Sequence, residues 1–179
     1  TYFEWAAASD QKIVVPWRVI DGPESAGSVA EEILKAPLRR ASRTSISGAI
    51  NFGMRLLGEN PYKGLRRVID ISGDGPNNNG EPVLIARDAA LEKGVTINGL
   101  PVMVKQASYA TMDIEKLDLY YEDCVIGGAG SFVVPINAPI TWFLFDPSIC
   151  TPLRLLALMT VSKLGSVDPT VFWYVPGPR

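Results

Sequence analysis

The sequence predicts an α/β fold in which a mostly parallel sheet is covered by helices. Between residues 12 and 104, apolar runs of strand length alternate with amphipathic segments in the order strand, helix, helix, strand, helix, strand. The connections are short, and alternation of this kind requires crossovers, which produce parallel strands. Ligands of such sheets bind beyond the carboxyl ends of the strands, so a site is expected in the loops at that edge.

The composition is that of one globular domain. The chain has 179 residues, of which 47% are hydrophobic and 20% charged, with a net charge of −2. These values give no reason to expect binding to nucleic acid, and no apolar run is long enough for a membrane span. The absence of histidine excludes His-dependent catalytic triads and His-ligated metals. Cys124 and Cys150 are too few for a zinc site, and whether they form a disulfide stays open.

The N-terminal third predicts two strands and a helix. Residues 1–7 and 12–20 are rich in β-branched and aromatic residues and are joined by a polar turn. Residues 25–36 predict a helix whose buried face carries Val29 and Ile33.

A second helix is predicted over residues 42–61, where hydroxyl residues precede an apolar stripe. The stripe consists of Ile46, Ile50, Gly53 and Leu57. A strand–helix–strand unit follows, with strands over 66–72 and 95–104 and a helix over 82–94. The right-handed crossover rule then predicts that residues 65–71 and 95–102 are adjacent and parallel.

The last quarter of the chain departs from this pattern. Residues 118–136 predict a short helix, a glycine-rich bend and a strand over 131–136. Residues 138–179 hold six of the 14 prolines and only five charged residues, without a helical or strand period. We expect this atypical, proline-rich apolar tail to pack poorly.

The stretch DISGDGPNNNG, residues 70–80, ends a buried strand and at once presents one carboxylate among glycines and amides. Asp74 is either a turn residue that bonds its own backbone or a metal ligand at the edge of the sheet. Thr44, before the second helix, is either the helix N-cap or a hydroxyl ligand at the same edge. Oxygen ligands of this kind suit Mg²⁺ or Ca²⁺.

Three further polar residues are candidates for a ligand-binding rim around such a site. Asn77 and Asn78 either give the loop its shape or offer their amides to a bound group. Ser42 is either a cap or part of the rim. Asp70 lies inside the apolar strand and is interpreted as a buried, hydrogen-bonded structural acid.

Five stretches, VVPWRVID, SRTSISGAI, RRVIDISGDGPNNNG, GVTINGLPV and YYEDCVIGGAGSFVV, carry a resemblance. Through them the chain resembles the von Willebrand factor type A domain, in a bacterial branch of uncharacterised exported proteins. The resemblance implies a Rossmann-like three-layer sandwich over residues 1–137 and a periplasmic or secreted location. It also implies a metal-ion-dependent adhesion site for Mg²⁺, or Ca²⁺ or Mn²⁺, in which Thr44 and Asp74 match ligand positions.

The family places an Asp-x-Ser-x-Ser metal loop after a first strand, and this sequence has no such loop. The chain shows no signal peptide and begins inside a predicted strand, so we interpret it as an N-terminally truncated fragment. Only two of the expected ligands are then present, and we expect cation binding to be weak or absent.

The sequence favours a non-enzymatic protein-binding module. A carboxylate of a protein partner would complete the coordination of the cation and so fix the docking. One alternative is a fragment without activity of its own. A less favoured alternative is a metal-assisted hydrolase that uses Asp70 and Asp74, although no histidine and no paired nucleophile and base support it.

Overall fold

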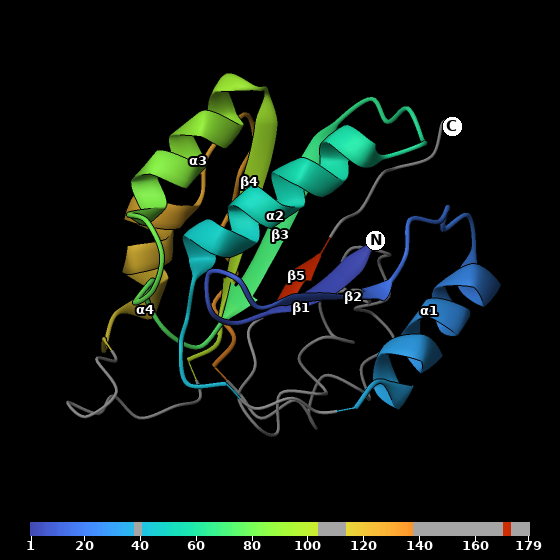
Figure 1. The fold of residues 1–179 in the computed structure, drawn as a ribbon, viewed down its shortest axis with the longest axis horizontal. Coiled ribbons are helices and arrows are strands. Elements are labelled where there is room, and N and C mark those ends of the chain that lie inside the picture. Colours follow the sequence, from blue (N-terminus) through green and yellow to red (C-terminus); the bar gives the residue numbers. More distant parts are fainter. Residues whose placement is uncertain (38–40, 104–113, 138–169, 173–179) are drawn as a thin grey trace.

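The computed structural model describes residues 1–37, 41–103, 114–137 and 170–172 (Figure 1). These residues form an α/β domain, which confirms the predicted class. The elements are, in chain order, β1 (Tyr2–Trp5), β2 (Gln11–Val15), α1 (Pro23–Lys35), α2 (Ile46–Glu59), β3 (Arg67–Gly73), α3 (Val83–Glu92), β4 (Val95–Pro101), α4 (Leu117–Tyr120), the π-helix η2 (Tyr121–Val125) and β5 (Thr170–Phe172). No helix in these ranges is long and apolar enough to cross a membrane.

The sheet has the strand order β2-β1-β5-β3-β4 and is less parallel than predicted. Among the described strands, only β3 and β4 pair in parallel, whereas β1–β2, β1–β5 and β5–β3 are antiparallel. The difference has two causes: β1 and β2 form a hairpin, and β5 enters the sheet in reverse. Because β5 is antiparallel to both neighbours, β1 still runs in the direction of β3 and β4. Three carboxyl ends therefore meet at one edge.

The predicted strand–helix–strand unit is confirmed. β3 and β4 pair in parallel from Arg67 opposite Val95 to Gly73 opposite Pro101, and α3 connects them. The first strand begins at Arg67 rather than Leu65, whose side chain is 92% exposed. The connecting helix ends before Gly94, whose φ of 70° suits glycine at a helix stop.

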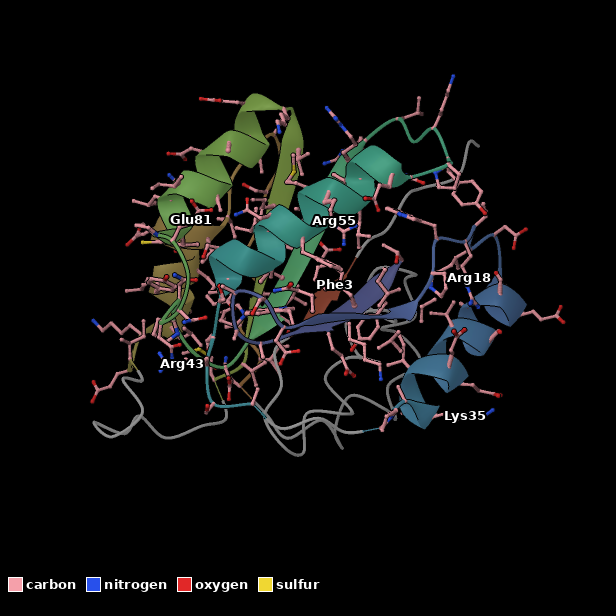
Figure 2. The ribbon with its side chains drawn as sticks, in the orientation of Figure 1. Phe3, Arg18, Lys35, Arg43, Arg55 and Glu81 are labelled. Carbon is pink, nitrogen blue, oxygen red and sulfur yellow. The ribbon has the colours of Figure 1, made fainter. Side chains whose placement is uncertain are left out.

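One face of the sheet packs against α2, α3 and η2 and forms the main core. Phe3 of β1 lies beneath α2, with its ring centroid 4.7 Å from that of Phe52 (Figure 2). The strand residues of this core are Phe3, Trp5, Ile69, Ile71, Val95 and Ile97. Ile46, Ile50 and Gly53 of α2 are buried as predicted, but Leu56 rather than Leu57 completes the stripe.

The helix α1 packs against the β1–β2 hairpin at the end of the sheet away from α3 (Figure 1). Its predicted face is confirmed, since the second core cluster consists of Tyr2, Val15, Val29 and Ile33. An ion pair of 2.7 Å between Arg18 Nη2 and Glu32 Oε2 adds to this contact (Figure 2). The strand predicted over 12–20 stops at Val15, because Pro16 has no N–H to continue the ladder.

The strand predicted over 131–136 is present only as isolated bridges along β4. Gly99 bridges Val133 and Val102 bridges Ile136, both in parallel. Of the tail, residues 138–179, the structure describes only 170–172, which form β5. The prediction that the tail packs poorly otherwise lies outside the described residues.

Candidate functional site

The carboxyl ends of the strands meet the start of α2 at one edge of the sheet. We call this edge the rim and define it by residues 6–8, 44–47 and 74–81. The N–H of Ser45 donates to the carbonyl of Ala6 at 2.7 Å, which joins α2 to the end of β1. The N–H of Val102 donates to the carbonyl of Gly73 at 2.8 Å, which joins the ends of β4 and β3. The rim is therefore continuous across the sheet.

Two of its asparagines fasten the loop after β3 to the start of α2. Asn78 Oδ1 accepts from the Thr44 N–H at 2.8 Å, and the Asn78 N–H donates to the Thr44 carbonyl at 2.8 Å. Asn77 Oδ1 accepts from the N–H and the hydroxyl of Ser47, at 3.0 and 3.2 Å. Both side-chain oxygens thus accept hydrogen bonds within the rim, and these bonds hold the loop against the start of α2.

A third asparagine bonds to the turn after β1, and the glycine that follows it packs closely against the start of α2. Asn79 Oδ1 accepts from the Ala8 N–H at 2.9 Å. The next residue, Gly80, has a φ of 84°, and a Cβ there would lie 2.7 Å from Ser45 Oγ. Both the backbone conformation and the close approach therefore require glycine.

Thr44 is not the cap of α2, because Ser45 has that role. Ser45 Oγ accepts from the Gly48 N–H at 3.1 Å. Thr44 is half-buried, and its hydroxyl makes no hydrogen bond with the residues the structure describes. Ser42 is exposed two residues earlier. The Thr44 hydroxyl is thus a rim group that makes no hydrogen bond within the described part of the chain.

Asp74 follows β3 directly and lies against the main core. Its Oδ2 atom is buried. Burial first, and then the charge of Asp74, raise the pKa of the fully buried Tyr121 hydroxyl above its usual range. One oxygen of the carboxylate therefore faces inward from the end of the strand, while the residue as a whole is half-buried.

The positions of Thr44 and Asp74 determine which ligands the rim could offer a cation. Thr44 and Asp74 lie in two segments that are hydrogen-bonded to each other through Asn78. Within the described ranges, no group of three or more Asp, Glu, Cys or His side chains gathers. A cation here would rest on one carboxylate and one hydroxyl, with water in its other positions. That donor set suits a hard cation such as Mg²⁺.

Asp70 lies within β3 and belongs to the sheet rather than to the rim. Its Oδ1 accepts from Asn98 Nδ2 of β4 at 2.7 Å, and both side chains are buried. Burial raises the pKa of Asp70 to about 6, although the hydrogen bond from Asn98 acts against that shift. The bond accounts for the acid as a structural residue of the strand pair.

Cys124 is a free cysteine that packs, half-buried, against the main core. Cys150 lies outside the described residues.

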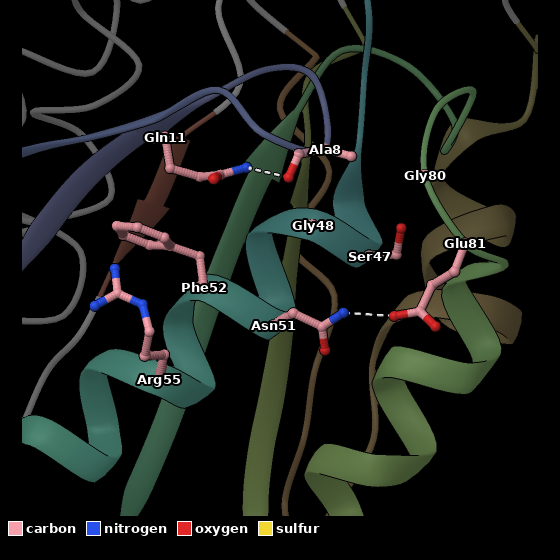
Figure 3. Close-up of a pocket in the computed structure, with 9 residues that line it drawn as sticks. All are labelled: Ala8, Gln11, Ser47, Gly48, Asn51, Phe52, Arg55, Gly80 and Glu81. Carbon is pink, nitrogen blue, oxygen red and sulfur yellow. Dashed lines mark hydrogen bonds between the residues drawn. The ribbon is translucent and has the colours of Figure 1, made fainter.

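A cavity of about 310 Å³ adjoins the rim on the side of α2 and was missed by sequence reasoning (Figure 3). It is lined by Ala8, Gln11, Ser47, Gly48, Asn51, Phe52, Arg55, Gly80 and Glu81. These residues come from the hairpin turn, from α2 and from the loop before α3. No local sequence pattern unites them, because only the packing of the three segments brings them together.

Comparison with known proteins places the chain in a family. Residues 1–143 match the family described as "Protein of unknown function (DUF1194)". No curated protein sequence matches the chain. Among solved structures, proximal thread matrix protein 1 from the mussel byssus is similar, with a TM-score of 0.53 at 13% identity, over 90% of this chain and 33% of that one. This likeness concerns the fold alone, and the chain spans about a third of the matrix protein's length. Since the family match covers most of its residues, the chain belongs to the DUF1194 family.

Proposed function

We propose that the chain is a non-enzymatic protein-binding module of the von Willebrand factor A type, built as a Rossmann-like three-layer sandwich. A divalent cation at the rim would capture a carboxylate of a protein partner. The observation that supports this most is the Thr44 hydroxyl, which bonds to no described residue and lies in a segment bonded to the loop that Asp74 begins. The resemblance of these two segments to an adhesion site supports the same choice, and because the resemblance is to exported proteins, we propose a periplasmic or secreted location.

The chemistry needs no reaction step. The Asp74 carboxylate supplies the charge that a hard cation requires, and the Thr44 hydroxyl supplies a neutral oxygen. A partner carboxylate that replaces one water would bind both to the cation and to the rim, so a single charged contact would orient the partner. The bonds that Asn77 and Asn78 make with the start of α2 hold the loop in place before binding, which lowers the entropy cost of docking.

Titration of Mn²⁺ or Mg²⁺ into the chain, followed by calorimetry, tests the cation. Two protein ligands are few for an ion that prefers six, so we expect weak binding, with a Kd on the order of millimolar. A chain that also carried an upstream Asp-x-Ser-x-Ser loop should bind more tightly.

Two substitutions decide which residue is responsible. We expect Asp74→Ala to abolish the binding and Asp88→Ala, an exposed acid on α3, to leave it unchanged. Equal binding by the chain and by Asp74→Ala would remove Asp74 from the site and the proposed function with it.

A further inference from the structure

The side-chain amides that line the cavity beside the rim donate hydrogen bonds to described residues but accept none from them. Gln11 Nε2 donates to the carbonyls of Ala7 and Ala8, at 3.0 and 3.1 Å. Asn51 Nδ2 donates to Oε1 of Glu81. The carbonyl oxygens of both amides accept no hydrogen bond from a described residue, although both residues line the cavity (Figure 3). Among the described residues, three of the four amide N–H groups thus donate hydrogen bonds, whereas neither amide oxygen accepts one.

The donors at the start of α2 are occupied as well. The Gly48 N–H donates to Ser45 Oγ, and Ser47 donates through its N–H and its hydroxyl to Asn77 Oδ1. Apart from the guanidinium of Arg55, the polar groups that the wall of the cavity offers a ligand are therefore chiefly acceptors.

Arg55 and Glu81, the two charged residues that line the cavity, differ in their partners. Arg55 Nη1 lies 2.9 and 3.0 Å from the two carboxylate oxygens of Glu59, and the guanidinium of Arg55 stands 4.6 Å from the centroid of the Phe52 ring. Its charge is paired with the carboxylate of Glu59 within α2. Glu81 forms no ion pair with any residue in the described ranges. Among the residues that the structure describes, Glu81 is thus the charged lining residue without an oppositely charged partner.

We propose that this cavity binds a guanidinium group, such as the side chain of an arginine in a peptide or protein. A guanidinium has five N–H donors in a plane and no acceptor, and it pairs well with a carboxylate. Glu81 binds its charge, and the amide oxygens of Gln11 and Asn51 accept its remaining donors. The aliphatic stem lies against Phe52. A volume of about 310 Å³ is at the lower end of the range for small-ligand sites, which suits one side chain. This site uses neither Thr44 nor Asp74 and needs no cation.

The experiment compares two peptides of equal shape in the presence of a chelator. The first is acetyl-Gly-Arg-Gly-amide, and the second carries citrulline, which is uncharged, in place of arginine. Calorimetry or NMR titration of the 179-residue chain should show at least about tenfold tighter binding of the arginine peptide. Amide shifts should change at residues 47–52 and 80–81.

Two variants locate the site. Glu81→Gln keeps an oxygen for the Asn51 bond but removes the charge, so it should weaken binding of the arginine peptide about tenfold. Glu92→Gln changes an exposed glutamate at the other end of α3 and should leave it unchanged. Thermal unfolding shows whether each variant is folded.

Equal affinity for the two peptides, or no binding of either at millimolar concentration, overturns the proposal without any variant. Equal binding by the chain and by folded Glu81→Gln overturns it too. None of these results affects the cation at the rim, which is measured without peptide.

Discussion

Single asparagine side chains carry much of the geometry at the rim. Asn77, Asn78 and Asn79 follow one another in the chain, yet each side-chain oxygen accepts from a different residue. These oxygens accept from N–H groups at the start of α2 and in the turn after β1. Such N–H groups have no partner within the helix or the sheet. A run that reads as a flexible loop is for this reason a fixed connection between three segments.

Asp70 gives a prediction at the same scale, because its pKa of about 6 in the folded chain lies above its ordinary value of 3.8. A raised pKa means that the contribution of Asp70 to stability is complete below pH ~4 and is lost as the pH rises through ~6. Asp70→Asn keeps an acceptor for Asn98 and carries no charge. From pH 4 to pH 7, the free energy of unfolding of this variant should rise by about 2–3 kcal/mol relative to that of the original chain.

Urea denaturation at several pH values measures this difference. Asp88→Asn, at an exposed position of α3, is the control and should follow the original chain. A difference between Asp70→Asn and the original chain that does not vary with pH would show that Asp70 titrates normally.

At the scale of elements, the start of α2 and the loop before α3 fit together only where side chains are absent. A Cβ at Gly48 would lie 2.9 Å from the Cα of Ala8, and one at Gly80 would lie 2.7 Å from Ser45 Oγ. Such distances are shorter than the packing of real side chains allows. The hairpin turn, α2 and the loop therefore approach each other closely at the position where the cavity begins.

Two glycine substitutions test this close approach. Gly80→Ala places a side chain at a φ of 84° and against Ser45, and should lower the free energy of unfolding by about 2 kcal/mol or more. Gly27→Ala in α1 meets open space, and it should raise the free energy of unfolding by about 0.5–1 kcal/mol, because alanine favours a helix. Thermal denaturation of both variants gives the comparison, and a neutral Gly80→Ala would contradict the tight rim.

At the scale of the whole molecule, the sheet depends on a strand from near the end of the chain. β5 pairs with β1 through Tyr2, Phe3 and Glu4, and with β3 through Asp70, Ile71 and Ser72. It thus joins the hairpin and α1 to the unit of β3, α3 and β4. Without β5, neither of these parts would have a paired edge toward the other.

Val171 lies in the middle of β5, opposite Phe3 and Ile71, and tests this arrangement. Val171→Pro removes a backbone N–H from the ladder and should lower the free energy of unfolding by about 3 kcal/mol. Val171→Ala keeps the N–H and should cost less. Urea denaturation of the two variants measures the contrast, and equal stabilities would show that residues 170–172 do not hold the sheet together.

Local and periodic features were predictable from the sequence. The pairing of β3 with β4 across α3 follows from strand and helix lengths and the handedness of crossovers. The buried positions Ile46, Ile50 and Gly53 follow from the helical repeat. Both depend on residues close in the chain, where spacing alone fixes which side chains share a face.

The tertiary structure decided what depends on distant residues. It placed β5 between β1 and β3, which made the sheet mixed rather than mostly parallel. It gave the helix cap to Ser45, left the Thr44 hydroxyl without a bond to any described residue, and formed a cavity that Glu81 helps to line. The sequence by itself determined most of the helices and strands before residue 104 and the edge at which polar residues collect. Their contacts were decided only by packing, because a hydrogen bond or an ion pair requires two groups within about 3–4 Å, and the spacing of residues along the chain does not fix that distance.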